Sequence, residues 1–237
     1  MTDTAKRAGE NRRTILDMSD ARGMFDDLLM HWSGANAGLG SRPIELTGGY
    51  TRARFLEQAV RFDHMAEEIE AATQDRNRVG EDLIHYKVAV RKAIERLSYL
   101  VPGLADGTEF ARRFPSVPDH RSSEAKFLAT VDKVAELWTA HDGEHPTPLV
   151  LPDGTTSRDF ARGVVHLRKA FRVREEATQR ERGLRDERRA LHKSLVERAV
   201  QYRKVIQALG PEHEALITSL PYLWPKQDRR KKTTVPA

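Results

Sequence analysis

Apolar residues recur at helical spacing in two long stretches of this chain. In the first stretch, one heptad position is occupied by Phe55, Phe62, Ile69, Leu83, Val90 and Leu97, and its partner position by Ala59, Ala66, Ile94 and Val101. The second stretch keeps the pattern through Phe160, Val164, Leu167, Phe171, Leu195, Ala199, Tyr202 and Ile206. Such spacing predicts two long helices, each with a coiled-coil-like seam.

The middle of each stretch interrupts the apolar seam with polar residues, at 73–78 and 178–183. Two structures fit this pattern. Either one helix continues through a solvated waist, or the chain turns back as a helical hairpin near 73–82 and 178–187. The stretches contain no proline and are rich in Ala, Gln, Glu and Arg, which are good helix formers. We therefore favour a continuous helix of roughly 50 residues, about 75 Å long, over the hairpin.

The two stretches belong to a longer internal repeat, in which the second copy begins about 105 residues after the first. Phe55 corresponds to Phe160 and Pro43 corresponds to Pro148. The segments 43–51 and 148–156 share apolar positions, a glycine and a final threonine, and 72–74 and 177–179 both read Ala-Thr-Gln. The sequence thus predicts two tandem units of the same plan, each of ordinary domain size.

Each copy contains the same further elements. A short amphipathic helix near Met24–Trp32, or Phe127–Trp138, leads into a loop at 34–43 or 142–148, and then into a short extended arm at 44–46 or 149–151. Thr51 and Thr156 are placed to cap the long helices, and each copy ends with a short helix near 108–113 or 212–220. The predicted fold is all-α: two tandem homologous helical repeats with long coiled-coil-like helices and short extended arms. The predicted segments are a basic disordered tail at 1–13, repeat 1 at 14–118, repeat 2 at 119–225 and a basic tail at 226–237.

The composition of the chain excludes some kinds of site and indicates where the protein is located. The chain has no cysteine, which excludes disulfides and thiolate metal sites. It has neither an apolar stretch after the N-terminal basic residues nor a run of about 20 apolar residues, so we expect no secretory signal and no membrane segment. These features predict a soluble, cytoplasmic protein, although a protein exported without a signal peptide would have the same sequence.

Few residues suggest catalysis or metal binding. The one metal-like cluster, residues 141–145, contains His141, Asp142, Glu144 and His145. It lacks the His-Glu-x-x-His spacing of a zinc helix and has no counterpart in the first copy, so we interpret it as a solvated loop. No phosphate-binding loop and no nucleophile motif is present in the sequence. We therefore predict no enzyme activity, no cofactor and no metal.

The strongest binding signal is the arginine-rich stretch 168–198, which has eleven basic and six acidic side chains. One face of the predicted helix carries Arg182, Arg185, Arg189 and Lys193. Such a row of cations suits phosphate contacts, and with the basic C-terminal tail it indicates a nucleic-acid-associated protein. The interleaved acidic residues favour the other interpretation, a solvated helix face with ion pairs along it.

The apolar and aromatic segment 220–225 precedes the basic tail. It either packs against its own repeat as a clamp or is exposed as a docking peptide. In the second case, the residues that would bind a partner are Tyr222, Trp224, Arg229, Arg230, Lys231 and Lys232. The duplicated helical body and these terminal segments predict a non-catalytic structural, scaffold or assembly protein that binds a protein partner or itself. Nucleic-acid association through 168–198 is the alternative.

Overall fold

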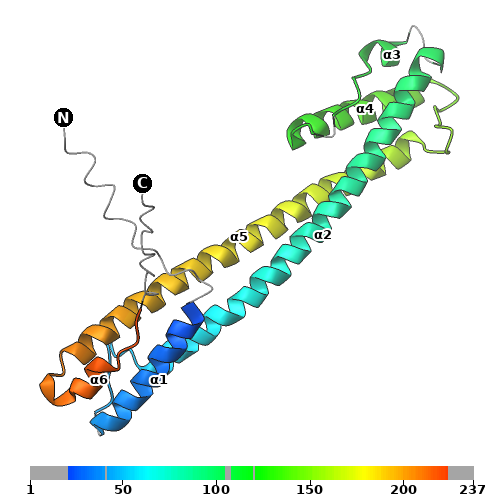
Figure 1. The fold of residues 1–237 in the computed structure, drawn as a ribbon. Helices are drawn as coiled ribbons and strands as arrows, with labels where there is room; N and C mark the ends of the chain where they lie inside the picture. The colour runs from blue at the N-terminus through cyan, green and yellow to red at the C-terminus, as the bar shows by residue number, and fades with distance from the viewer. Residues whose placement is uncertain (1–20, 41, 105–107, 120, 224–237) are drawn as a thin grey trace, which may run out of the picture. The chain divides into compact units, whose positions relative to one another are not determined.

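Helices are the only regular elements in the part of the chain that the structure describes. The computed structural model describes residues 21–40, 42–104, 108–119 and 121–223; the predicted tails at 1–13 and 226–237 lie outside this range. The helices are α1 (Ala21–Leu39), α2 (Arg52–Leu104), α3 (Glu109–Arg113), α4 (Glu124–Glu144), α5 (Ser157–Gln207), the 3-10 helix η1 (Pro211–His213) and α6 (Glu214–Thr218) (Figure 1). The all-α prediction is confirmed.

The two long helices are continuous. α2 has 53 residues and α5 has 51, and both run unbroken through the polar stretches where a hairpin was the alternative. The preference for one continuous helix is confirmed. The residues of these stretches, 73–78 and 178–183, are half-buried or exposed except Glu181, so the predicted waist is solvated apart from this one buried carboxylate.

Two compact units divide the chain. Unit 1 consists of residues 1–68 and 184–237, and unit 2 consists of residues 69–183. Unit 1 thus contains α1, the start of α2, the end of α5, η1 and α6, whereas unit 2 contains the rest of α2, α3, α4 and the start of α5. Each unit combines the beginning of one predicted repeat with the end of the other. The repeat boundaries at 14–118 and 119–225 describe a duplication of sequence, and they stay a prediction.

The core of unit 1 is built from aromatic side chains of α1, α2 and α5. Phe25 of α1 makes edge-to-face contacts with Phe55 and Phe62 of α2, at centroid distances of 5.6 and 5.9 Å. Trp32 stacks on Tyr202 of α5 at 4.5 Å. Aromatic pairs in these geometries add to the stabilisation that comes from burying apolar area. The apolar face of α1 therefore packs against α2 and α5 to complete this core.

The core of unit 2 uses α4 where unit 1 uses α1. Trp138 of α4 lies 5.6 Å from Phe160 of α5, measured between ring centroids. The same buried cluster includes the α2 residues Leu83, Val90, Ile94, Leu97 and Val101 and the α5 residues Val164, Leu167 and Phe171. These residues are the predicted seam positions at the end of α2 and the start of α5. The seam prediction is therefore confirmed at these positions.

Near the polar stretch of α2 the buried positions differ from the predicted seam. Ile69 and Ala66 were predicted to lie on it but are half-buried, whereas Met65 and Ala72 are buried in their place. A straight α-helix drifts by about 20° per heptad relative to a strict seven-residue repeat. A strict seven-residue seam is therefore not expected to hold along the whole of a straight helix.

The short helices extend further than predicted, because their last turns fix the arms. α1 continues to Leu39 and α4 to Glu144, so the predicted loops at 34–43 and 142–148 begin too early. Asn36 Oδ1 accepts a hydrogen bond from the backbone N–H of Ile44 (2.9 Å). Asp142 Oδ1 accepts one from Leu149 N–H (2.8 Å). Asn36 and Asp142 reach their arms because each lies in the last turns of its helix.

The two arms are held to their helices by a second pair of similar bonds. Trp32 Nε1 donates to the Ile44 carbonyl at 3.3 Å, and Trp138 Nε1 donates to the Leu149 carbonyl at 3.1 Å. Both tryptophans are fully buried, so their N–H groups need a partner inside the protein. The arm carbonyl supplies that partner in each unit.

After each arm, a glycine turn leads into the long helix. Leu46 and Tyr50 form an antiparallel bridge, and Leu151 N–H bonds the Thr155 carbonyl at 2.9 Å. Gly49 and Gly154 lie in these turns with φ of 66° and 83°, a region that residues with a side chain rarely adopt. Glycine is therefore required at both turns.

The predicted helix caps are present. Thr51 Oγ1 accepts from Arg54 N–H at 3.4 Å at the start of α2. At the start of α5, Thr156 Oγ1 accepts from Asp159 N–H (3.3 Å) and Asp159 Oδ2 accepts from Thr156 N–H (3.1 Å). This reciprocal pair is a capping box, so the second long helix has the stronger start signal.

Candidate functional site

The predicted arginine row is exposed on α5. Arg185, Arg189 and Lys193 share one exposed face in unit 1, and Arg182 is exposed in unit 2. Arg189 pairs with Asp186 at 2.9 Å, as expected for a helix face that carries its own ion pairs. Arg188, next to this row, turns inward, and its guanidinium lies 4.4 Å from the Phe62 ring centroid. The row is exposed to solvent, and its binding of nucleic acid stays a prediction.

The C-terminal segment is a clamp in the part that is described. Leu220 and Leu223 are buried in the core of unit 1, and Arg203 Nη1 donates to the Pro221 carbonyl at 3.1 Å. Tyr222 is 68% exposed between the two leucines. The other predicted partner-binding residues lie outside the described residues: Trp224, Arg229, Arg230, Lys231 and Lys232.

The histidine cluster at 141–145 was interpreted as a solvated loop, and this interpretation is wrong. His141 lies in the last turn of α4 and is buried, because its ring packs 5.1 Å from Phe110 and stacks on His145 at 4.1 Å. His145 Nδ1 donates to the His141 carbonyl at 2.8 Å. Among the described residues, no three His, Asp or Glu side chains are grouped so that they could hold a metal ion.

A buried ion pair lies between α2 and α5 in unit 2. Glu181 is 3% exposed, and its Oε2 lies 2.7 Å from Arg76 Nη1. Thr73 Oγ1 donates to Glu181 Oε1 at 3.2 Å. A carboxylate that leaves water needs such charged and neutral partners. These contacts among Thr73, Arg76 and Glu181 take the place of apolar packing where the polar stretches interrupt the seams of α2 and α5.

Removing Arg76 should therefore destabilise the fold. We expect Arg76→Ala to lower the free energy of unfolding by about 2 kcal/mol, because Glu181 would stay buried without its charged partner. The double variant Arg76→Leu with Glu181→Leu should recover most of this loss, since a well-packed apolar pair often replaces a buried ion pair at no cost. Urea denaturation measures both changes.

Arg78→Ala is the matched control, because Arg78 pairs with Asp75 on the exposed side of the same helix. Exposed pairs contribute roughly 0 to 1 kcal/mol, so this variant should change the unfolding midpoint little. Equal losses from Arg76→Ala and Arg78→Ala would show that the buried pair has no special weight.

A histidine–tyrosine pair ties α1 to α5 and α6 in unit 1. His31 Nε2 lies 3.0 Å from the Leu216 carbonyl, which can only accept, so Nε2 carries the proton. His31 Nδ1 then accepts from the Tyr202 hydroxyl at 2.8 Å. Burial raises the pKa of Tyr202. Both groups are committed to joining helices rather than to proton transfer.

His192, on the same face of α5, also serves packing. Its ring packs against both Phe25 and Phe62, at centroid distances of 6.2 and 5.7 Å. Loss of solvent lowers the pKa of His192, and the nearby Arg188 lowers it further. Both effects favour the neutral form of this imidazole.

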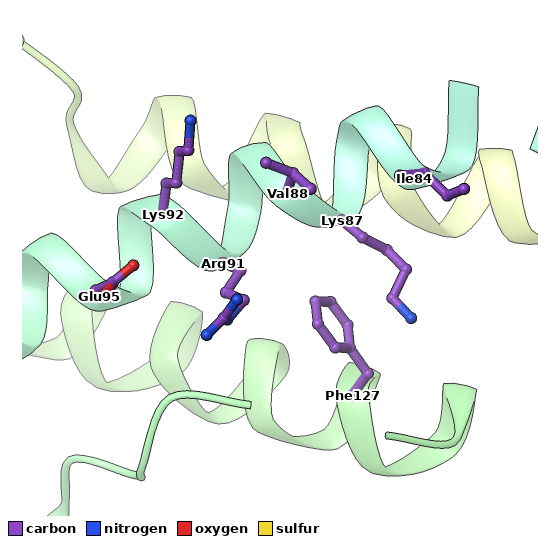
Figure 2. A pocket seen from close by; sticks show the side chains of 7 residues that line it. All are labelled: Ile84, Lys87, Val88, Arg91, Lys92, Glu95 and Phe127. Carbon is purple, nitrogen blue, oxygen red and sulfur yellow. The ribbon is translucent and has the colours of Figure 1, made fainter. Parts of the chain in front are cut away.

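A cavity of about 600 Å³ lies between α2 and α4 in unit 2, and the sequence patterns did not predict it. Figure 2 shows the Phe127 ring of α4 pointing toward α2, with Arg91 and Lys87 on either side of it. We call it the cationic pocket; its lining residues are Ile84, Lys87, Val88, Arg91, Lys92, Glu95 and Phe127. The sequence contains one indication of this pocket: two apolar residues off the predicted seam, Ile84 and Val88, have basic residues at helical spacing around them.

In comparisons with known proteins, no family model, no curated protein and no solved structure matches the chain. Within the described ranges, no helix is both long and apolar enough to cross a membrane. The cytoplasmic location stays a prediction.

Proposed function

We propose that this protein is a non-catalytic structural or assembly protein built from an internal duplication. The observation that carries the proposal is the recurrence of the same tertiary contacts about 105 residues apart. Trp32 and Trp138 donate to the carbonyls of Ile44 and Leu149 in the same way. The caps of the two arms, Asn36 and Asp142, recur at the same interval.

Contacts inside the long helices support the same duplication. Thr73 Oγ1 donates to the carbonyl four residues earlier at 2.8 Å, and Thr178 does the same at 2.8 Å. Gln74 and Gln179 also each bond the glutamate four residues earlier. The residues of the buried ion pair, at 76 and 181, are themselves 105 positions apart. Contact between two equivalent positions is expected where two copies of one helix cross at a symmetry axis.

The chemistry of the described residues favours assembly over catalysis. The buried ionisable groups described above connect helices to one another, and none of them lines the cationic pocket. Val60 in unit 1 is 60% exposed, and Val165 in unit 2 is 66% exposed. These two valines are 105 residues apart, so each unit carries an exposed apolar side chain at the same position. A pair of equivalent contact points suits joining like subunits, because two linked contacts bind more tightly than one.

Sedimentation of the intact chain over a range of concentrations tests this proposal. We expect reversible self-association, and a drop of at least about tenfold in the association constant for the double variant Val60→Glu with Val165→Glu, which corresponds to about 1.4 kcal/mol. Deleting residues 224–237 should also weaken association while the helical circular dichroism is kept.

The control is Tyr99→Glu, which changes another exposed apolar residue of α2. Its counterpart 105 residues later is Lys204, so this contact point is not duplicated and association should be unchanged. A chain that stays monomeric at every concentration and captures no protein partner would contradict the proposal.

The nucleic-acid alternative is supported by one observation, the exposed face with Arg185, Arg189 and Lys193. Binding through this face would weaken steeply with salt, because phosphate contacts release counterions. It would also weaken in Arg185→Glu. Both results together with no self-association would favour the alternative over the assembly role.

A further inference from the structure

We propose that the cationic pocket of unit 2 binds a small amphipathic anion, with a carboxylate or phosphate head and an aliphatic body. The inference does not depend on the assembly role. A cavity of about 600 Å³ is in the range that holds a small organic ligand. It lies between two helices of one unit, where the packing of α4 against α2 fixes its walls.

Charge selects the head of the ligand. Three cations line the pocket, Lys87, Arg91 and Lys92, against one carboxylate, Glu95. Lys87 Nζ lies 4.8 Å from the centroid of Phe127 and 5.9 Å from that of Phe171, so its charge is held above aromatic rings. An anion placed among these cations relieves their mutual repulsion.

Arg91 supplies an unused donor. Its Nε is buried and has no hydrogen-bond partner. A buried donor without a partner is costly, and most such groups in proteins are paired. A carboxylate or phosphate group that reaches Arg91 would satisfy this donor, and two of its oxygens could accept two parallel bonds from the guanidinium.

Apolar side chains select the body of the ligand. Ile84 is 62% exposed and Val88 is 44% exposed, one helical turn apart on α2, and Phe127 faces them from α4 (Figure 2). A hydrocarbon chain lying along this surface would remove Ile84 and Val88 from water, which is favourable, while the buried Phe127 ring forms the opposite wall. The adjacent cations explain why the ligand is amphipathic rather than a neutral hydrocarbon.

Unit 1 does not repeat this set of residues. At the interval of about 105 residues, Lys87 corresponds to the buried His192, Val88 to Lys193 and Phe127 to Ala21. The aromatic wall and the exposed apolar pair are thus replaced. We therefore expect one ligand per chain, bound in unit 2.

Calorimetric titration of the full chain with four probes tests the proposal. We expect decanoate and decyl phosphate to bind with one site per chain, and decan-1-ol and acetate to bind at least about tenfold more weakly. The two anionic probes distinguish a carboxylate head from a phosphate head. A neutral alcohol that binds as tightly as decanoate would overturn the charge recognition, and acetate binding as tightly would overturn the recognition of the apolar body.

Matched variants locate the site. Val88→Glu places a carboxylate at the rim of the pocket, and Arg91→Met keeps an unbranched side chain but removes the charge and the donors; each should weaken decanoate binding at least about tenfold. Leu56→Glu changes an apolar residue of the same helix in unit 1 that is 41% exposed, close to the 44% of Val88, and it should bind as the unaltered chain does. Circular dichroism verifies that each variant is folded. Unchanged binding in folded Val88→Glu and Arg91→Met would overturn the assignment.

Chemical protection gives a second readout on the unaltered protein. Decanoate should slow acetylation of Lys92, which lines the pocket, while leaving Lys193 of unit 1 unaffected, as measured by mass spectrometry. Equal protection of the two lysines, or protection of neither, would show that the ligand binds elsewhere.

Discussion

Replacing Phe62 by alanine should lower the free energy of unfolding by about 3 to 5 kcal/mol, the usual cost of removing a buried phenyl ring. The Phe62 ring is 1% exposed in the core of unit 1. It contacts the rings of Phe25 and His192 and lies under the guanidinium of Arg188. The variant would lose contacts with both α1 and α5. We therefore expect relaxation of the neighbouring side chains to recover little of the lost stability.

Chemical denaturation followed by circular dichroism measures this change. Leu56→Ala is the control, because Leu56 lies on the same helix and is 41% exposed; it should cost far less. Phe171→Ala applies the same test to the core of unit 2, where Phe171 is buried. An unfolding midpoint that does not move in Phe62→Ala or Phe171→Ala would show that the seam is misplaced.

The sequence pattern was sufficient for the elements. Phe55 and Phe62 were predicted to lie on the seam of the first long helix, Leu167 and Tyr202 on the seam of the second, and all four are buried. The threonine caps and the final short helices were also located, because caps and helical periodicity are local features that a sequence displays directly. The ends of α1 and α4 were not predicted, since they depend on tertiary bonds from Asn36 and Asp142 to the arms.

The pattern did not indicate which segments pack together. Tandem copies suggest two units that follow one another along the chain, whereas each compact unit takes its helices from both copies. Seam positions on two long helices indicate that the helices pack together, but they do not determine whether the packing is parallel or antiparallel. The pairing of Trp32 with Tyr202, 170 residues apart, depends on an antiparallel arrangement.

The candidate sites were predicted unevenly. The exposure of Arg185, Arg189 and Lys193 followed from helical periodicity. The burial of Glu181 did not, because a charged residue in a polar stretch reads as solvated until its partner, Arg76, is known. The cationic pocket was missed for a similar reason: Phe127 approaches Lys87 only through the packing of α4 on α2.

Dividing the chain between residues 118 and 119 should abolish folding of both fragments when each is alone. Unit 1 needs residues up to 68 and residues from 184 onward, and unit 2 needs residues on both sides of the cut. Fragment 1–118 would thus lack the α5 residues that cover Phe25 and Trp32, and fragment 119–237 would lack the α2 residues that cover Trp138. Pairing of a fragment with itself is disfavoured, because equivalent positions would bring Arg76 against Arg76 or Glu181 against Glu181.

The central claim, that two copies of one helical plan interlock, is tested most directly by mixing these two fragments. Far-ultraviolet circular dichroism and sedimentation of each fragment and of the equimolar mixture are the measurement. The account predicts little cooperative helical structure in either fragment and a one-to-one complex in the mixture, with helical signal and cooperative unfolding restored. Two fragments that each fold as a cooperative monomer would contradict it.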